Sequence, residues 1–178
     1  MFIGTMRLHR MLRIPYFSTL FLAIAGLSAA EKSLIFRVND LTFERPAEWS
    51  WERPSSSMRK AQLSVPGKDG AADVVFFYFG PGGAGGVQAN VDRWIGQFQE
   101  VKGKKIDSKK IGGTPVTFVE ASGTFLTGPP FGQKVPKAGY ALRGAIIGAK
   151  GGAIFIKMTG PKKTVEKAAP DFMKMAEK

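Results

Sequence analysis

The sequence predicts an α+β fold in which an antiparallel β-sheet of about six strands is flanked by helices. Short runs of β-branched and aromatic residues, bounded by Gly, Pro, Asn and Asp, indicate the strands. Two segments, residues 87–99 and the chain after Gly160, carry apolar residues at helical spacing. Several strands, one helix, about three more strands and a last helix follow one another, and this grouping favours an antiparallel sheet.

The first part of the predicted domain is made of strands joined by short turns. Residues 74–79 are apolar at every position, which is typical of a central strand that is covered on both faces. Asn39 and Asp40 supply the first turn. The expected elements are strands at 33–38, 41–43, 60–65 and 74–79, a proline-directed corner at 45–49 and irregular chain at 50–59.

A glycine-rich loop at 80–86 ends the regular structure, and a helix is expected to follow it at 87–99. Its apolar side chains fall on one stripe about 100° wide, which belongs in the core. Gly96 weakens this helix by about 1 kcal/mol relative to Ala. The residues of the stripe are Val87, Val91, Trp94, Ile95 and Phe98.

The second part is expected to alternate strands with loops and to end in a helix. Residues 121–123 suggest a bulge or bend, because the apolar face of the strand around them changes sides. Pro170 is expected to kink or restart the last helix by removing a backbone hydrogen bond. The expected elements are a lysine-rich connection at 101–110, a strand at 115–126, a loop at 127–139, a hairpin of 140–149 and 153–159, and a helix from Gly160-Pro161.

Residues 1–30 resemble an export signal. Three arginines precede an apolar run at 14–27, and Ser28-Ala29-Ala30 offers a signal-peptidase site before Glu31. The competing interpretation is a retained membrane anchor, although about 14 apolar residues fall short of the roughly 20 that cross a bilayer. We therefore expect a single domain at 31–178, located in the periplasm or outside the cell, with no transmembrane span after cleavage. The true start among Met1, Met6 and Met11 stays open.

Composition limits the chemistry of this domain. The chain has no Cys, and its one His, His9, lies in the expected signal. Most zinc sites, thiol chemistry and acid–base catalysis at neutral pH are therefore disfavoured, and neither a metal nor a cofactor is expected. Without the three arginines of the signal, 23 of the 26 basic residues remain against 14 acidic ones, a net charge of +9. Such a surplus attracts anionic partners.

The glycine-rich loop is one candidate for ligand contact, through Gly82, Gly83 and Gly85. Gly80, Gly82 and Gly85 match the spacing of a dinucleotide-binding turn between a strand and a helix. Five glycines among seven residues make such a match easy by chance. Anion binding by exposed amides and a plain tight turn are the alternatives.

A polar stripe of Asn90, Arg93 and Gln97 on the expected helix is the second candidate. An arginine fork flanked by amides can recognise a carboxylate or a phosphate. The alternative is a structural network in which Arg93 binds loop carbonyls or a carboxylate such as Asp92 or Glu120. Replacing Arg93 by Ala distinguishes the two, through the melting temperature and partner binding.

A lysine run is the third candidate, for contact with an anionic surface. Such a run is also typical of a solvated face. No helix-turn-helix, zinc or aromatic ribonucleoprotein pattern is present, so sequence-specific nucleic-acid binding is not expected. The run consists of Lys102, Lys104, Lys105, Lys109 and Lys110.

Catalytic sets are sparse, and no catalytic residue is assigned. The serines at 55–57 have no His to act as a base, and a Ser-Lys pair with Lys60 or Lys157 matches no known motif. Carboxylates for hydrolysis could come from Glu48, Glu52, Asp92 or Glu120, but no spacing places two of them in one cleft.

Two resemblances extend this interpretation. Residues 44–49, with Pro46 and Trp49, resemble a corner of small PsbP-like domains, the fold of an extrinsic photosystem protein and of a Ran-binding nuclear import factor; this resemblance implies an α/β/α sandwich. Asn90-x-x-Arg93-Trp94-x-x-Gln97-Phe98 and four further motifs resemble an uncharacterised family of exported bacterial proteins. The four are residues 57–59, the aromatic strand with its Gly-Pro-Gly-Gly loop, 123–125 and 157–161. Neither resemblance implies a catalytic activity.

The sequence therefore predicts an exported, non-catalytic binding or accessory protein of the cell envelope. Its partner would be an unknown protein or an anionic envelope component. The alternative is a small hydrolase that works without His, through carboxylates or a Ser-Lys pair. A purely structural factor with one broad apolar patch is a third possibility. The oligomeric state stays open.

Overall fold

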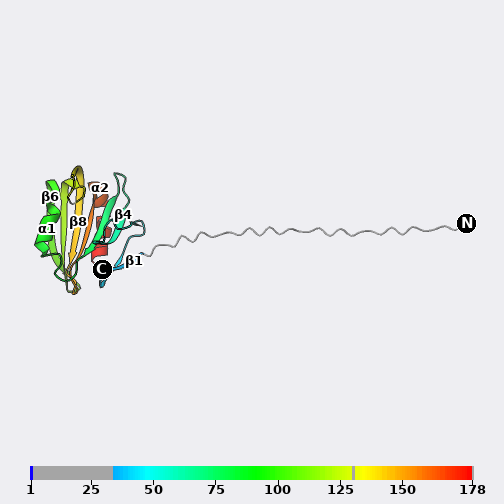
Figure 1. The fold of residues 1–178 in the computed structure, drawn as a ribbon, viewed down its shortest axis with the longest axis horizontal. Coiled ribbons are helices and arrows are strands. Elements are labelled where there is room, and N and C mark those ends of the chain that lie inside the picture. Colours follow the sequence, from blue (N-terminus) through cyan, green and yellow to red (C-terminus); the bar gives the residue numbers. More distant parts are fainter. Residues whose placement is uncertain (2–33, 130, 178) are drawn as a thin grey trace. The chain divides into compact units, whose positions relative to one another are not determined.

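Seven antiparallel strands form one sheet in the order β3-β4-β5-β9-β8-β7-β6 in a computed structural model (Figure 1). The structure describes Met1 and residues 34–129 and 131–177, so the expected signal lies outside the described residues except for Met1. The strands are β3 (Ser50–Trp51), β4 (Arg59–Val65), β5 (Ala72–Tyr78), β6 (Phe98–Ile111), β7 (Thr114–Thr127), β8 (Val135–Ile147) and β9 (Ile154–Pro161).

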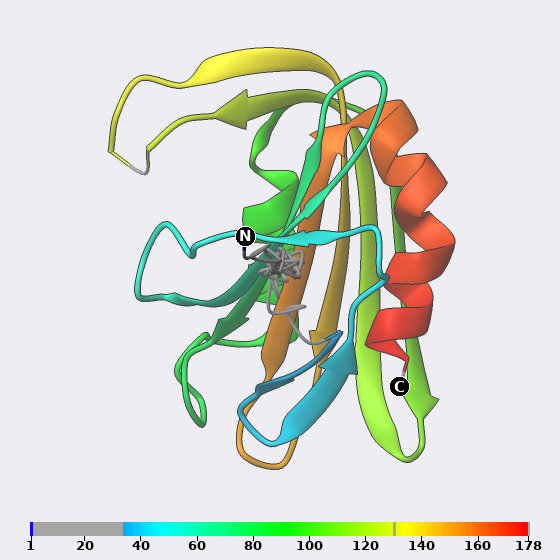
Figure 2. The same cartoon turned by 90° about the vertical axis from the view of Figure 1, so that its right-hand side faces the viewer.

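Two helices lie on opposite faces of this sheet, α1 (Val87–Ile95) and α2 (Lys162–Ala176) (Figure 2). A separate hairpin of β1 (Ile35–Val38) and β2 (Leu41–Glu44) packs on the same side as α2. We call the two sides the α1 face and the α2 face. The arrangement confirms an α+β fold with a mostly antiparallel sheet between helices.

The core is divided by the sheet into two hydrophobic clusters. On the α2 face, Phe172 packs with Ile156 and Met158 of β9, and all three are fully buried. On the α1 face, Trp94 lies edge-on to Phe155 with ring centroids 6.4 Å apart. Gly144 of β8 makes room for the Trp94 ring, since a Cβ there would lie 2.1 Å from the indole. Burial of these large side chains supplies most of the driving force for folding.

The structure of the lysine-rich segment differs most from the elements expected from the sequence. Residues 101–110 do not form a connection; they are part of β6, a 14-residue edge strand paired with β7. Gly112 and Gly113 both have positive φ, 55° and 83°, as a two-residue hairpin turn requires. This Gly-Gly signal was present in the sequence. The apolar pattern alone missed the strand because nearly every residue of β6 is exposed.

Other boundaries shift for local reasons. The sheet has seven strands because β6 and the two-residue β3 join it, the latter within the chain expected to be irregular. Helix α1 ends at Ile95, where Gly96 forms its C-cap, and β6 begins at Phe98. Strand β8 begins at Val135, inside the expected loop, because the β7–β8 ladder continues past a bulge between Gly123 and Phe125.

The bulge agrees with the bend expected at 121–123. The last helix begins at Lys162 and is continuous through Pro170, so it does not restart there. No helix among the described residues is long and apolar enough to span a membrane.

Candidate functional site

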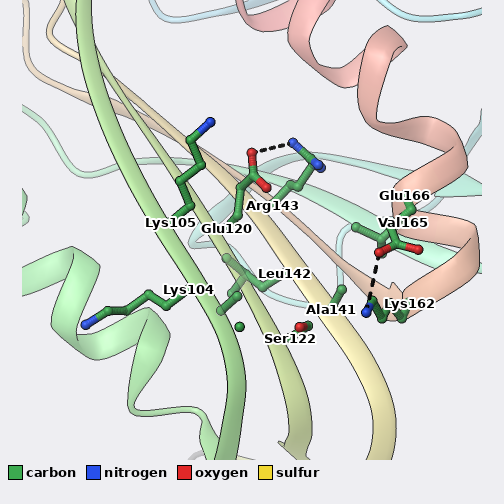
Figure 3. A pocket seen from close by; sticks show the side chains of 12 residues that line it. Lys104, Lys105, Glu120, Ser122, Ala141, Leu142, Arg143, Lys162, Val165 and Glu166 are labelled. Carbon is green, nitrogen blue, oxygen red and sulfur yellow. Dashed lines mark hydrogen bonds and ion pairs between the residues drawn. The ribbon is translucent and has the colours of Figure 1, made fainter.

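A cavity of about 200 Å³ opens on the α2 face, where β6, β7 and β8 meet the start of α2 (Figure 3). Its floor is hollow because three small residues stand side by side on neighbouring strands. Gly103 of β6 pairs with Ser122 of β7, and Ser122 pairs with Ala141 of β8. Small side chains in one row leave space that larger residues would fill, and the Ser122 hydroxyl gives that space a polar atom.

A charged row borders the hollow, two positions further along the strands. Lys105, Glu120 and Arg143 are direct register partners on β6, β7 and β8. Nη1 of Arg143 donates to Oε1 of Glu120 at 2.8 Å, and the Arg143 side chain is 21% exposed. Opposite charges on facing positions stabilise a sheet by roughly 0.2–1 kcal/mol. The row therefore holds a fixed carboxylate between two cations.

The first turns of α2 close the other side of the cavity. Lys162 pairs with Glu166 at 3.6 Å, and the buried Val165 packs between them against the sheet (Figure 3). Pro161, the N-cap, makes no side-chain capping hydrogen bond, and the first turn holds no acidic residue. The partial positive charge of a helix N-terminus is thus not neutralised by an acidic first turn.

The electrostatic balance at this cavity favours anions. Three cations border it on the α2 face, Lys105, Arg143 and Lys162, against two carboxylates, Glu120 and Glu166. Both carboxylates are in ion pairs. In the described part of the chain, no group of three or more His, Cys, Asp or Glu residues could hold a metal ion. The side chains that line the cavity offer ion pairing and hydrogen bonding.

Strand alternation divides the five lysines of the sequence prediction between two faces. Lys104 is opposite Ala121, which is buried on the α1 face, whereas Lys105 is opposite Glu120 on the α2 face. Figure 3 shows the two side chains diverging. Lys109 binds Glu177 at 2.7 Å, and Lys102 pairs with Glu100 at 3.7 Å. The five lysines do not form one surface, and of the two that adjoin the cavity only Lys105 lies on its face of the sheet.

The second predicted candidate, the stripe on α1, contains a hydrogen-bonded pair. Asn90 is 2% exposed, and its side-chain amide donates to the carbonyls of Ala84 and Gly86, each at 2.9 Å. Nη1 of Arg93 donates to Oδ1 of Asn90 at 2.6 Å. Neither Asp92 nor Glu120 is its partner: Asp92 accepts from Gln88, and Glu120 accepts from Arg143. The pair thus fixes the helix to the preceding loop.

The glycine-rich loop has geometric reasons for its glycines. Gly82 and Gly85 have positive φ, 69° and 75°, a region that favours glycine. A Cβ on Gly83 would lie 2.1 Å from the carbonyl oxygen of Phe79. Asn90 holds the end of this loop through Ala84, so the loop adjoins Asn90 and, through it, Arg93.

Gln97 lies apart from the Asn90–Arg93 pair and contacts Lys157 instead. In the sequence, Lys157 is a candidate only as one half of a Ser-Lys pair. Nζ of Lys157 on β9 donates to Oε1 of Gln97 at 3.0 Å. Burial lowers the pKa of Lys157 from 10.5 to about 8, with repulsion from Arg59 adding to the shift and Asp73 opposing it. A cation in such surroundings marks a candidate functional position.

Sequence reasoning missed the cavity itself. Arg143 and Lys162 are single basic residues in a basic chain, and only the pairing of β6, β7 and β8 brings them to Lys105. A signal for Arg143 did exist, because it is the one charged residue in the predominantly apolar strand at 140–147.

Comparisons with known proteins bear on the fold. No protein-family model matches the chain, and no curated protein matches it. The structure is similar to the solution structure of cyanobacterial PsbP, CyanoP, from Synechocystis, with 13% identity, a TM-score of 0.49 and coverage of 86% of this chain and 95% of that chain. It is also similar to a Pseudomonas aeruginosa protein of unknown function described as a candidate regulator, with 14% identity, a TM-score of 0.44 and coverage of 79% and 90%.

Proposed function

We propose that this protein is an exported, non-catalytic binding or accessory protein of the cell envelope that holds an anionic group of its partner in the cavity between β6, β7, β8 and α2. The observation that carries the proposal is a cavity with small residues at its floor and more cations than carboxylates around it. Lys105, Arg143 and Lys162 come from three separate elements and line one opening. Charge-assisted hydrogen bonds from such groups are about twice as strong as neutral ones.

The size of the cavity supports a partner's group over an enclosed substrate. Small-molecule sites commonly measure about 300–1,000 Å³ and bury most of the ligand. This cavity, at about 200 Å³, accommodates one headgroup or one acidic side chain. The rest of the partner would then lie on the surrounding surface, as a binding module requires.

The hydrolase alternative receives less support from the same residues. Glu120 and Glu166 both line the cavity, but each is held by a cation, Arg143 and Lys162 respectively. A general acid–base pair needs one carboxylate protonated and the other ionised, with environments that separate their pKa values. Two carboxylates that each pair with a cation lack that asymmetry.

Export is part of the proposal. The charged, apolar and small-residue segments of 1–30 support cleavage after Ala30, and the motif around Asn90, Arg93 and Trp94 resembles exported bacterial proteins. The mass of the protein recovered from periplasm or medium tests this directly. An N-terminus at Glu31 is expected. A membrane-bound protein that retains residues 1–30 would contradict export.

Quantitative capture from solubilised envelope at 0.2 M salt tests the binding role. We expect the double variant Arg143→Met/Lys162→Met to retain less than about a tenth of the partner, because loss of one charge pair in a partly buried contact is worth roughly 1.5–3 kcal/mol. Lys163→Met/Lys167→Met is the matched control, since it removes the same number of positive charges from exposed positions of α2. Equal capture by all three proteins, each with an unchanged melting temperature, would refute the cavity as the binding site.

A further inference from the structure

A second polar cluster lies on the α1 face, on the opposite side of the sheet from the cavity. Gln62, Val75 and Lys157 are direct register partners across β4, β5 and β9. They point to the α1 face because their neighbours Leu63, Val74 and Met158 belong to the core of the α2 face. Helix α1 packs over β6 and β7, and its Trp94 over β8, so it leaves this part of the face without a helix.

Val75, in the middle of the row, is nevertheless 3% exposed. It belongs to neither hydrophobic cluster. Side chains of the row and its surroundings therefore shield it. Two cations belong to this region, Lys157 in the row and Arg59, which binds Gln62 of the row, and both are only partly exposed.

Amide oxygens orient the two cations. Nη1 of Arg59 donates to Oε1 of Gln62 at 3.0 Å, and Nζ of Lys157 donates to Oε1 of Gln97 at 3.0 Å. Each cation keeps further N–H donors, because a guanidinium has five and an ammonium three. The amides thus fix the cations without neutralising them.

No carboxylate neutralises the pair within the part of the chain that the structure describes. Neither Arg59 nor Lys157 has a carboxylate oxygen within ion-pair distance. The charged groups that act on Lys157 are Arg59 from β4 and Asp73 from β5, while its register partner on β8 is the uncharged Gly144. Partly buried charges are usually paired, because desolvation without compensation is costly.

We infer that Arg59 and Lys157 together bind an oxyanion group over Val75, a phosphate, sulfate or carboxylate that accepts from the guanidinium and the ammonium at once. The remaining donors of both cations supply the hydrogen bonds, and the anion adds negative charge to that of Asp73, which acts on Lys157 without forming an ion pair with it. This site is separate from the cavity on the α2 face and goes beyond the function proposed for it.

Anion binding at this site is coupled to the protonation of Lys157. A bound anion stabilises the charged form of Lys157 and so raises its pKa from about 8. By the same linkage, deprotonation of Lys157 weakens anion binding. Affinity is expected to fall about fourfold between pH 8 and pH 9.5, and about tenfold over the whole titration of Lys157.

Sulfate is the probe for this inference, because it does not titrate in this range. An NMR titration of the lysine Nζ and Cε signals, at constant ionic strength set with NaCl, follows Lys157 in the wild-type protein. Saturating sulfate is expected to move its midpoint upward by about one pH unit, which corresponds to tenfold tighter binding by the charged form. A midpoint that sulfate leaves unmoved would overturn the site.

Calorimetry of variants identifies the residues. Lys157→Met and Arg59→Met should each abolish sulfate binding, whereas Lys60→Met, which removes an exposed charge next to Arg59, should retain it. Retained binding in both site variants would overturn the inference. The wild-type titration decides the question if a site variant fails to fold.

Two further experiments distinguish this site from the cavity and identify the source of the anion. Arg143→Met/Lys162→Met should leave the Lys157 titration and its response to sulfate unchanged, so failure of one proposal does not imply failure of the other. Glycerol phosphate and vesicles containing phosphatidylglycerol then distinguish a free phosphate from a lipid headgroup. A Lys157 midpoint that depends on the cavity variants would contradict a separate site.

Discussion

Arg93 donates a hydrogen bond from Nη1 to Oδ1 of Asn90 at 2.6 Å, one turn apart on α1. The same Asn90 side chain donates to Ala84 and Gly86 in the loop before the helix. The two hydrogen-bonded residues differ in burial. Asn90 is 2% exposed, whereas Arg93 is exposed. The pair is a structural joint between loop and helix.

Asn90→Ala is expected to lower the free energy of unfolding by about 1–3 kcal/mol, since two part-buried hydrogen bonds to loop carbonyls are lost, each worth about 0.5–1.5 kcal/mol. Arg93→Ala should lower it by less than about 1 kcal/mol, because an exposed hydrogen bond contributes little. Urea denaturation measures both. Gln88→Ala, which removes an exposed hydrogen bond to Asp92 on the same helix, is the control. A larger loss for Arg93→Ala than for Asn90→Ala would contradict this ranking.

Gly144→Ala is expected to destabilise the domain by about 1–3 kcal/mol, because overpacking a close-packed core forces side chains out of place. The added Cβ would lie 2.1 Å from Cζ3 of Trp94. Thermal melting with tryptophan fluorescence reports both the loss and the movement of the indole. Gly86→Ser serves as the control, since a Cβ at Gly86 meets nothing within 4 Å and its φ is −71°. Equal melting temperatures for both variants would show that the contact is not tight.

Lys157 makes stability rise with pH across a defined window. Its pKa in the folded protein is about 8, below the 10.5 of an exposed lysine, so between these values the unfolded state binds more protons than the folded state. The full difference is on the order of 3 kcal/mol. Urea denaturation from pH 7.5 to 10.5 should therefore show stability increasing relative to Lys157→Met. Parallel pH profiles for the two proteins would contradict the lowered pKa.

The lysines of β6 are expected to keep the sheet edge from pairing with another copy. A 14-residue edge strand exposes a row of backbone donors and acceptors, and charged side chains discourage association there. Lys104→Thr/Lys110→Thr should therefore increase concentration-dependent association in analytical ultracentrifugation. Lys163→Thr/Lys167→Thr removes the same charge from α2 and should behave like wild type. If both double variants associated to the same extent, the cause would be the lower net charge and not the loss of lysines from the sheet edge.

Local patterns in the sequence predicted most strands and both helices. The run at 74–79 predicted a central strand, and β5 indeed lies inside the sheet with Val74, Val75 and Phe76 buried. The helical stripe correctly placed Val91, Trp94 and Phe98 in the core, but it was wrong for Val87, which is 46% exposed. Two strands escaped prediction, the two-residue β3 and the long β6; β6 was missed because an exposed edge strand carries no apolar alternation to detect.

The candidate sites were predictable only in part. Asn90, Arg93 and the glycine-rich loop were expected to adjoin, because a few residues separate them along one helix and its approach. Lys105, Arg143 and Lys162 were not, since they are far apart in sequence and meet only through strand register. The same holds for Arg59 and Lys157, on β4 and β9.

The sequence by itself determined the fold class, the position of most elements, the absence of cysteine and the excess of positive charge, because these follow from residue types and short-range periodicity. Tertiary structure decided which cations converge. Pairing of β6 with β7 and of β7 with β8 aligns Gly103, Ser122 and Ala141 into a hollow and sets Lys105, Glu120 and Arg143 along its border. Such alignment depends on long-range hydrogen bonding between strands, and no local pattern of residues encodes it.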